Sequence, residues 1–277
     1  TEPRQTEDEH RMIRAVAFDM DDTLLTGERT ITPFTLSVLR RAAERGVRIV
    51  PASGRARDSM FPYVKEIGCA SAFVACNGAE VYTAEGELER GILLTVEQAR
   101  ACAHFAAEND CYAQCYYGAH FYYNREGHWA TAYAESSMLT GCCVNDLETF
   151  IDRPTPKVLL MAEGEKIARL LPEARERFAG IAAVSCSKPW FLEFNPAQAT
   201  KGNALRYLAE KWDIPAEDFA AYGDSLNDVA MLDFAGRGVA MENAREDVKA
   251  RVRFTCGSNE SDGVARDILK YVLHEEA

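Results

Sequence analysis

Short apolar runs alternate with helical patterns near the start of this chain, and the alternation returns near its end. The runs at 13–18, 47–52 and 72–76 are mostly apolar, as strands buried on both faces of a sheet are. Helical patterns fill the intervals between them, at 32–45 and 57–67. Because strands joined through helices build parallel sheets, this alternation predicts an α/β fold with a doubly wound, Rossmann-like parallel sheet.

A different pattern fills the middle of the chain. Two aromatic-rich runs flank Gly118-Ala119, which predicts a hairpin of strands at 111–117 and 120–124. Helices and further short strands follow one another irregularly, which is typical of an α+β domain. In this stretch we expect helices at 95–109, 130–139 and 165–178 and strands at 158–161, 181–185 and 191–194.

The α/β rhythm then returns, with helices expected at 200–212 and 226–234 and strands at 219–222 and 238–241. We therefore expect one α/β domain that is interrupted by an inserted α+β domain. The first part of the α/β domain would span 1–82, with 1–12 as a loose tail. The insertion would span 83–193, and the second part of the α/β domain would span 194–277.

Composition narrows the classes of partner. The chain has 31 basic against 43 acidic residues and a net charge of −12, which disfavours a nucleic-acid partner. No apolar run approaches the roughly 20 residues of a membrane span, so no membrane partner is expected. Residues 1–14 are polar, and the nine cysteines are an odd number, so we expect reduced thiols and a cytoplasmic location. A zinc site is disfavoured because Cys111, Cys115, His120 and His128 do not have the usual ligand spacing.

Polar clusters follow three of the predicted strands. They are Asp19-Met20-Asp21-Asp22-Thr23, Ser53-Gly54-Arg55 and Gly223-Asp224-Ser225-Leu226-Asn227-Asp228. Lys201 opens the helix that follows the insertion. Because ligands bind outside the carboxyl ends of parallel strands, we expect these four segments to meet at one edge of the sheet.

The chemistry of that edge suggests phosphoryl transfer. Several carboxylates close together repel one another unless a cation neutralises them, and oxygen ligands without Cys or His favour Mg²⁺. Aspartate can accept a phosphoryl group covalently, and a hydroxyl with an ammonium can hold the charged phosphoryl oxygens.

These segments resemble the motifs of the haloacid dehalogenase superfamily. The four motifs correspond, in order, to residues 19–25, Ser53, Lys201-Gly202 and residues 223–228. Residues 77–79, 239–244 and 258–265 resemble the Cof-type sugar-phosphatase branch, known as subfamily IIB, more narrowly. The resemblance covers residues 13–272 and implies a phosphatase whose inserted domain is a cap over the active site. The chain departs from the commonest family pattern at Asp22, where glycine is more frequent.

The resemblance also implies roles for individual residues. Asp19 would attack phosphorus, and Asp21 would protonate the leaving oxygen and then activate water. Asp19, the backbone carbonyl of Asp21 and Asp224 would bind Mg²⁺, with Asp228 behind them. Ser53 and Lys201 would be catalytic by holding phosphoryl oxygens. The full expected phosphate- or substrate-binding set is Met20, Asp22, Ser53, Gly54, Arg55, Asn77, Lys201 and Asn227.

Three other functions share parts of these patterns. A phosphosugar mutase would use the same residues, with Asp21 returning the phosphoryl group to the sugar. The Gly223-Asp224-Ser225-Leu226 segment resembles that of an acyl esterase with Ser225 as nucleophile, but no histidine has Asp three places before it. A phosphoryl receiver module would be a single small domain without an insertion.

The insertion offers one more candidate feature. Its aromatic residues at 112, 116, 117 and 121–123 could line a substrate cavity, although strand aromatics more often pack a sheet. The expected partner is a small phosphorylated metabolite, such as a sugar phosphate, pyridoxal phosphate or flavin mononucleotide. Monomer and dimer both stay open.

Overall fold

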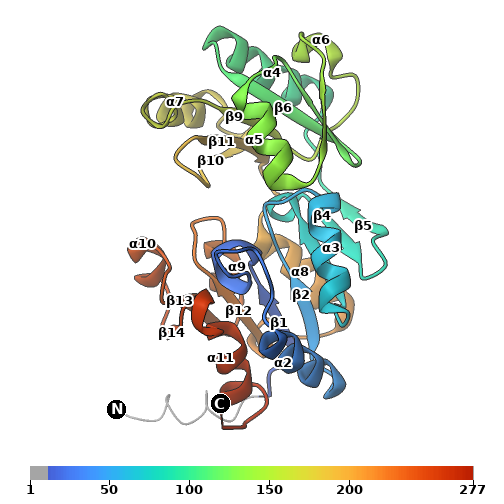
Figure 1. Ribbon diagram of the computed structural model, residues 1–277, viewed down its shortest axis with the longest axis vertical. Coiled ribbons are helices and arrows are strands. Elements are labelled where there is room, and N and C mark those ends of the chain that lie inside the picture. The colour runs from blue at the N-terminus through green and yellow to red at the C-terminus, as the bar shows by residue number, and fades with distance from the viewer. Residues whose placement is uncertain (1–11, 277) are drawn as a thin grey trace.

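The computed structural model describes residues 12–276 as two bodies, one above the other (Figure 1). The expected tail at 1–12 lies outside the described residues except for Met12. The lower body is built from both ends of the chain, and the upper body is built from the middle (Figure 1). This arrangement confirms the expected α/β fold with an inserted α+β unit.

A five-stranded parallel sheet forms the lower body, in the order β14-β13-β12-β1-β2. Its central strand β1 pairs with β12 on one side and with β2 on the other, with Ala15 opposite Phe219 and Arg48. Every residue of β1 and β12 is buried, as the continuous apolar runs predicted. The strands are β1 (Ala15–Phe18), β2 (Arg48–Pro51), β12 (Phe219–Gly223), β13 (Arg237–Met241) and β14 (Phe254–Cys256).

Four of the helices beside this sheet were predicted from the sequence, one of them with an earlier start, and the two that follow residue 241 were not predicted. Thr32 caps the first of them by accepting a hydrogen bond from the Thr35 amide at 3.0 Å. The helix expected at 226–234 begins only at Val229, because the Asp228 carboxylate accepts hydrogen bonds from the amides of Asp224 and Ser225 and forms a turn there. The helices are α2 (Pro33–Glu44), α3 (Arg57–Ile67), α8 (Lys201–Trp212), α9 (Val229–Phe234), α10 (Glu246–Lys249) and α11 (Gly263–Tyr271).

A small antiparallel sheet lies beside β2 and contains β3 (Ala72–Ala75), β4 (Glu80–Thr83) and β5 (Leu88–Gly91). The sequence predicted β3 as a third strand of the parallel sheet. It lies next to β2 with one isolated parallel bridge, between Ala52 and Val74, and with backbone hydrogen bonds from Ser71 to Ile49 and from Ser53 to Val74, but the two strands form no continuous ladder. Pro51 has no N–H to donate between the two strands, which limits the ladder there.

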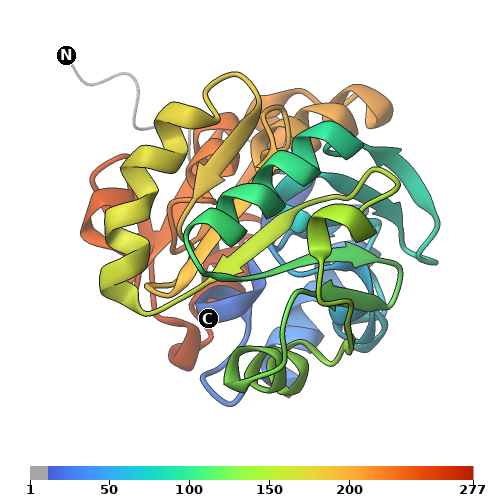
Figure 2. The ribbon, with the colours of Figure 1, turned by 90° about the horizontal axis from the view of Figure 1, so that it is seen from above.

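The upper body contains a six-stranded sheet in the order β10-β11-β9-β6-β7-β8. Helices α4 and α7 cover its outer face, as the view from above shows (Figure 2), and α5 lies between the sheet and the lower body (Figure 1). The hairpin of β6 and β7 is antiparallel, as predicted. The strands are β6 (Tyr112–Tyr117), β7 (His120–Tyr123), β8 (Thr140–Cys143), β9 (Val158–Met161), β10 (Ala182–Ser185) and β11 (Phe191–Pro196). The helices are α4 (Val96–Glu108), α5 (His128–Ser137), α6 (Leu147–Phe150) and α7 (Gly164–Arg177).

The expected boundaries after residues 82 and 193 fall inside β4 and β11, so the exact division of the chain stays a prediction. We call the unit built around the six-stranded sheet the cap and the remainder the core. In residues 12–276, every helix is too short or too polar to span a lipid bilayer.

Candidate active site

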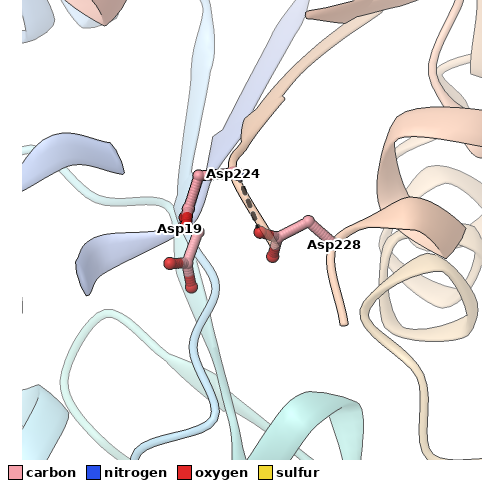
Figure 3. A group of neighbouring side chains, drawn as sticks. All are labelled: Asp19, Asp224 and Asp228. Carbon is pink, nitrogen blue, oxygen red and sulfur yellow. Dashed lines mark hydrogen bonds between the residues drawn. The ribbon is translucent and has the colours of Figure 1, made fainter. Parts of the chain in front are cut away.

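Three carboxylates meet at the carboxyl edge of the core sheet (Figure 3). Asp19 directly follows β1, Asp224 directly follows β12, and Asp228 stands just before α9. Carboxylate oxygens of all three lie within 4.8 Å of one another. The strand order therefore joins segments that are far apart in the sequence, as the expected edge site requires.

Lys201 supplies the positive charge beneath these carboxylates. It is the first residue of α8 and is fully buried. Its ammonium donates hydrogen bonds to Asp19 Oδ1 and, at 2.5 Å, to Asp228 Oδ1. Burial disfavours a charged lysine, but the two carboxylates raise the pKa of Lys201 above its usual value. The ammonium is therefore a permanent charge at neutral pH.

One ammonium does not balance three aspartates. Burial and the neighbouring aspartates raise the pKa of Asp19 well above its usual range, against the lowering effect of Lys201. Burial and the charge of Asp228 raise the pKa of Asp224 to about 6. Side-chain hydroxyls of Thr23 and Ser225 donate to Asp224, at 2.9 and 3.0 Å, and hold its oxygens in place. This buried oxygen donor set with excess negative charge fits a hard divalent cation.

Asp21 stands in a different environment from Asp19. Its carboxylate accepts two hydrogen bonds from the Arg55 guanidinium, at 2.7 Å from Nε and 2.6 Å from Nη2. Burial alone would raise the pKa of Asp21, but the paired guanidinium lowers it below its usual value. Arg55 also donates to the Ser136 carbonyl of the cap at 3.4 Å, so the pair lies where core and cap meet.

Two turns at this edge adopt left-handed backbone conformations. Asp22 has a φ of +59° and Asn77 a φ of +58°, which Asp and Asn tolerate better than most residues. This conformation explains why both Gly and Asp suit the position of Asp22. Gly78, with a φ of +100°, passes so close to the start of α8 that a Cβ there would lie 2.2 Å from the Thr200 carbonyl oxygen.

A cavity of about 170 Å³ opens between the core and the cap above these residues. Eight of the expected site residues line it: Asp19, Asp21, Asp22, Ser53, Gly54, Arg55, Asp224 and Asn227. The other four, Met20, Asn77, Lys201 and Asp228, are buried behind this lining. The Asn77 side chain accepts a hydrogen bond from Asn227 at 3.0 Å, so it contacts a lining residue instead of the cavity itself.

The cap supplies lining residues that the sequence analysis missed. They include Tyr133, Ser136, Lys157, Lys188, Phe191 and Glu193. Two of them carried a readable signal, because Lys157 directly precedes the apolar run of β9 and Glu193 interrupts the apolar run of β11. A lone charge in a buried strand often marks a functional position.

The aromatic residues of β6 and β7 do not line this cavity. Tyr112 stacks on Tyr123, and Tyr122 stacks on Phe150, with ring centroids 5.8 and 4.7 Å apart. Tyr116 reaches the cavity only indirectly, because its hydroxyl donates to the Tyr133 hydroxyl at 2.7 Å. Packing therefore accounts for most of this aromatic cluster.

The arrangement lacks what an acyl esterase would need. Ser225 donates to Asp224 and lies on the cavity wall, but no histidine occurs among the lining residues found in the described part of the chain. A serine nucleophile requires such a base within hydrogen-bond reach.

Comparison with known proteins agrees with the geometry. A family model for haloacid dehalogenase-like hydrolases matches residues 16–268. The chain is 27% identical to the phosphatase YwpJ of Bacillus subtilis, over 94% of this chain and 100% of that protein. It is 26% identical to the pyridoxal phosphate phosphatase YbhA of Escherichia coli, over 94% of this chain and 99% of that protein.

Solved structures give the same result. A haloacid dehalogenase-like hydrolase from Bacteroides thetaiotaomicron superposes with a TM-score of 0.84 at 30% identity, covering 92% of this chain and 98% of that one. The match spans both the core and the cap.

Proposed function

The chain belongs to the haloacid dehalogenase-like hydrolases and is a phosphoric monoester hydrolase, and we propose that it is a Mg²⁺-dependent phosphatase of small phosphorylated metabolites. One observation carries the proposal. Asp19, Asp224 and Asp228 converge around a buried ammonium, directly below a cavity lined by Ser53 and Arg55. This arrangement provides a nucleophile, a cation site and donors for phosphoryl oxygens.

We propose that Asp19 is the nucleophile. Its side chain reaches the cavity floor, and the Lys201 hydrogen bond orients one of its oxygens. Attack on phosphorus would form a phosphoaspartate and release the alcohol. Mg²⁺, when bound by Asp19, the Asp21 carbonyl and Asp224, would neutralise charge on the carboxylates and on the phosphoryl oxygens. Without neutralisation, the excess negative charge that raises the pKa of Asp19 and Asp224 would also repel the substrate.

Asp21 is the proposed acid and base. It would protonate the leaving oxygen and later remove a proton from the water that attacks the phosphoaspartate. The Arg55 pair favours the ionised form of Asp21, so the acid role requires Arg55 to release it. A substrate phosphoryl group competes for the same guanidinium, so substrate binding would raise the pKa of Asp21 when it is needed as an acid.

Ser53, Gly54 and Asn227 complete the proposed phosphoryl site. Ser53 Oγ accepts a hydrogen bond from the Arg55 amide at 3.1 Å, which fixes the turn and leaves its own proton free to donate to a phosphoryl oxygen. Asn227 is held by Asn77 on the opposite side. Cap residues line the cavity above them, and closure of the cap would exclude bulk water during transfer.

Phosphate release tests the proposal. We expect the protein to release phosphate from 4-nitrophenyl phosphate and from pyridoxal 5′-phosphate with MgCl₂, and to lose this activity in EDTA. Asp19→Asn should reduce release to that of the buffer, because an amide is a poor nucleophile. Asp247→Asn, on an exposed aspartate, is the matched control and should remain active.

The outcomes distinguish the phosphatase function from the alternative functions. Full activity in Asp19→Asn would disprove the role of the nucleophile, and activity that persists in EDTA would disprove the metal requirement. Transfer of phosphate to a sugar without its release would identify a mutase. A phosphoaspartate that accumulates without turnover would identify a receiver.

A further inference from the structure

Lys157 and Glu193 of the cap form a buried ion pair. Both residues belong to the wall of the cavity between the core and the cap. Each residue is only 3% exposed. The Lys157 ammonium donates to Glu193 Oε1 at 3.0 Å. Burial disfavours the charged lysine, yet the Glu193 carboxylate raises the pKa of Lys157 above its usual value. A pair of this kind adds little to stability compared with apolar residues, so its presence calls for another explanation.

The pair is incompletely hydrogen-bonded on the cavity side. Lys157 carries three N–H donors and uses two of them, for Glu193 and for a backbone carbonyl, and its ammonium also lies 5.1 Å from the centroid of the Tyr116 ring. Within residues 12–276, no hydrogen bond reaches Glu193 Oε2. Both side chains line the cavity. An acceptor oxygen of a residue that is 97% buried therefore faces the cavity beside an ammonium.

The pair is also anchored to the core. The backbone carbonyl that Lys157 contacts is that of Gly54, at 2.9 Å, next to Ser53 and Arg55. This contact crosses from the cap to the turn that we place at the phosphoryl group. A ligand group held by Lys157 and Glu193 would therefore belong to the part of the substrate beyond the phosphoryl group.

An unpartnered carboxylate oxygen beside an ammonium complements a hydroxyl, which donates a hydrogen bond to the carboxylate and turns its own oxygen toward the positive charge. An additional anion would be repelled by Glu193, and an alkyl group would leave Glu193 Oε2 without a hydrogen-bond donor. We propose that Lys157 and Glu193 determine specificity by binding a hydroxyl of the leaving alcohol. This inference rests on the phosphatase function proposed above and adds the residues that read its substrate.

Matched substrates test the inference. Rates of phosphate release would be compared for glycerol 1-phosphate against propyl phosphate, and for glucose 6-phosphate against cyclohexylmethyl phosphate. Sites built to bind a hydroxyl reject analogues that lack it. We expect kcat/KM of the parent protein to favour the hydroxylated member of at least one pair by about tenfold or more.

Two variants assign that preference to the ion pair. The double variant Lys157→Met/Glu193→Leu removes both charges at similar volume, and we expect the preference to fall to about onefold to twofold. Glu193→Gln keeps the volume and the acceptor oxygen without the charge. Its preference for the hydroxylated ester should therefore lie between that of the parent and that of the double variant. The exposed pair of Lys249 and Glu246, 3.0 Å apart, gives the control Lys249→Met/Glu246→Leu, which should keep the parent preference.

The outcomes are distinct. The inference is wrong if the parent hydrolyses both members of each pair equally, or if the double variant lowers both members by the same factor. The second result would mean that Lys157 serves the phosphoryl group or the fold. If the parent releases no phosphate from these esters or from 4-nitrophenyl phosphate, the phosphatase function fails, and the inference fails with it.

Discussion

Replacing Asp224 by asparagine should stabilise the metal-free protein while abolishing its activity. Asp224 is 9% exposed and shares its surroundings with Asp19 and Asp228, so its negative charge is unfavourable when no cation is bound. Asparagine has almost the same shape and retains an oxygen for the hydroxyls of Thr23 and Ser225. The substitution therefore removes charge with little change in packing.

The size of the effect follows from the pKa of Asp224. Burial and Asp228 raise it from 3.8 to about 6. Each pKa unit corresponds to about 1.4 kcal/mol, so ionised Asp224 costs the folded metal-free protein about 3 kcal/mol at pH 8. Asparagine accepts hydrogen bonds less strongly than a carboxylate, so we expect the free energy of unfolding to rise by roughly 1–3 kcal/mol.

The pH dependence has a defined sign. The folded state binds the proton of Asp224 more tightly than the unfolded chain does. The stability gained from this tighter proton binding at Asp224 is therefore complete below about pH 4 and is lost as the pH rises through about 6. The advantage of Asp224→Asn should be largest at pH 8 and should shrink markedly at pH 5.

Urea denaturation in EDTA at both pH values measures these differences. Asp247→Asn is the control, because Asp247 is exposed and its pKa is lowered by Arg245, so removing its charge should not stabilise the protein. Added MgCl₂ should stabilise the parent and not Asp224→Asn. The reasoning is refuted if Asp224→Asn is less stable than the parent at pH 8, or if its advantage is equal at both pH values.

Three further substitutions probe the same edge of the sheet. Lys201→Met leaves buried carboxylates without their ammonium, and should lower the free energy of unfolding in urea by about 3–5 kcal/mol in EDTA; a change below 1 kcal/mol would contradict this. Arg55→Lys removes the guanidinium that makes two hydrogen bonds to Asp21, and should raise KM for 4-nitrophenyl phosphate by roughly 10- to 100-fold. An unchanged KM would argue against phosphate binding by Arg55. Gly78→Ala forces both a clash and a strained φ, and should lower the free energy of unfolding by roughly 3 kcal/mol. Gly118→Ala has a strained φ but open space around its Cβ, and should lower it by about 1 kcal/mol. Equal losses in thermal or urea unfolding would show that the clash is relieved.

The sequence predicted that the acidic segments meet at one sheet edge because topology alone brings them together. Asp19 and Asp224 each follow a buried apolar strand, and parallel strands place such residues at one edge. Lys201 was identifiable because it opens a capped helix after the insertion. The hydrogen bonds of Lys201 to the aspartates then follow from the adjacency of β1 and β12.

Other features depended on single interactions that no local pattern reveals. The late start of α9 depends on the Asp228 carboxylate, and the separation of β3 from the parallel sheet accompanies a proline at position 51. Lys157 and Glu193 become neighbours only when β9 and β11 pair in the cap sheet and the cap lies over the core. Periodicity within each strand contains no information about that placement.

The order of β1 and β12 in the sheet has a consequence for synthesis of the chain. The hydrogen bond between Thr23 and Asp224 joins residues separated by 201 positions, and β1 pairs with β12 over a similar distance. The six strands of the cap, in contrast, come from one continuous stretch. On the ribosome the cap can therefore fold while β1 still lacks its partner, and Asp19 meets Asp224 only after β12 has emerged. A chain that stops before β12 would present a folded cap without the cluster of Asp19, Asp224 and Asp228 beneath it.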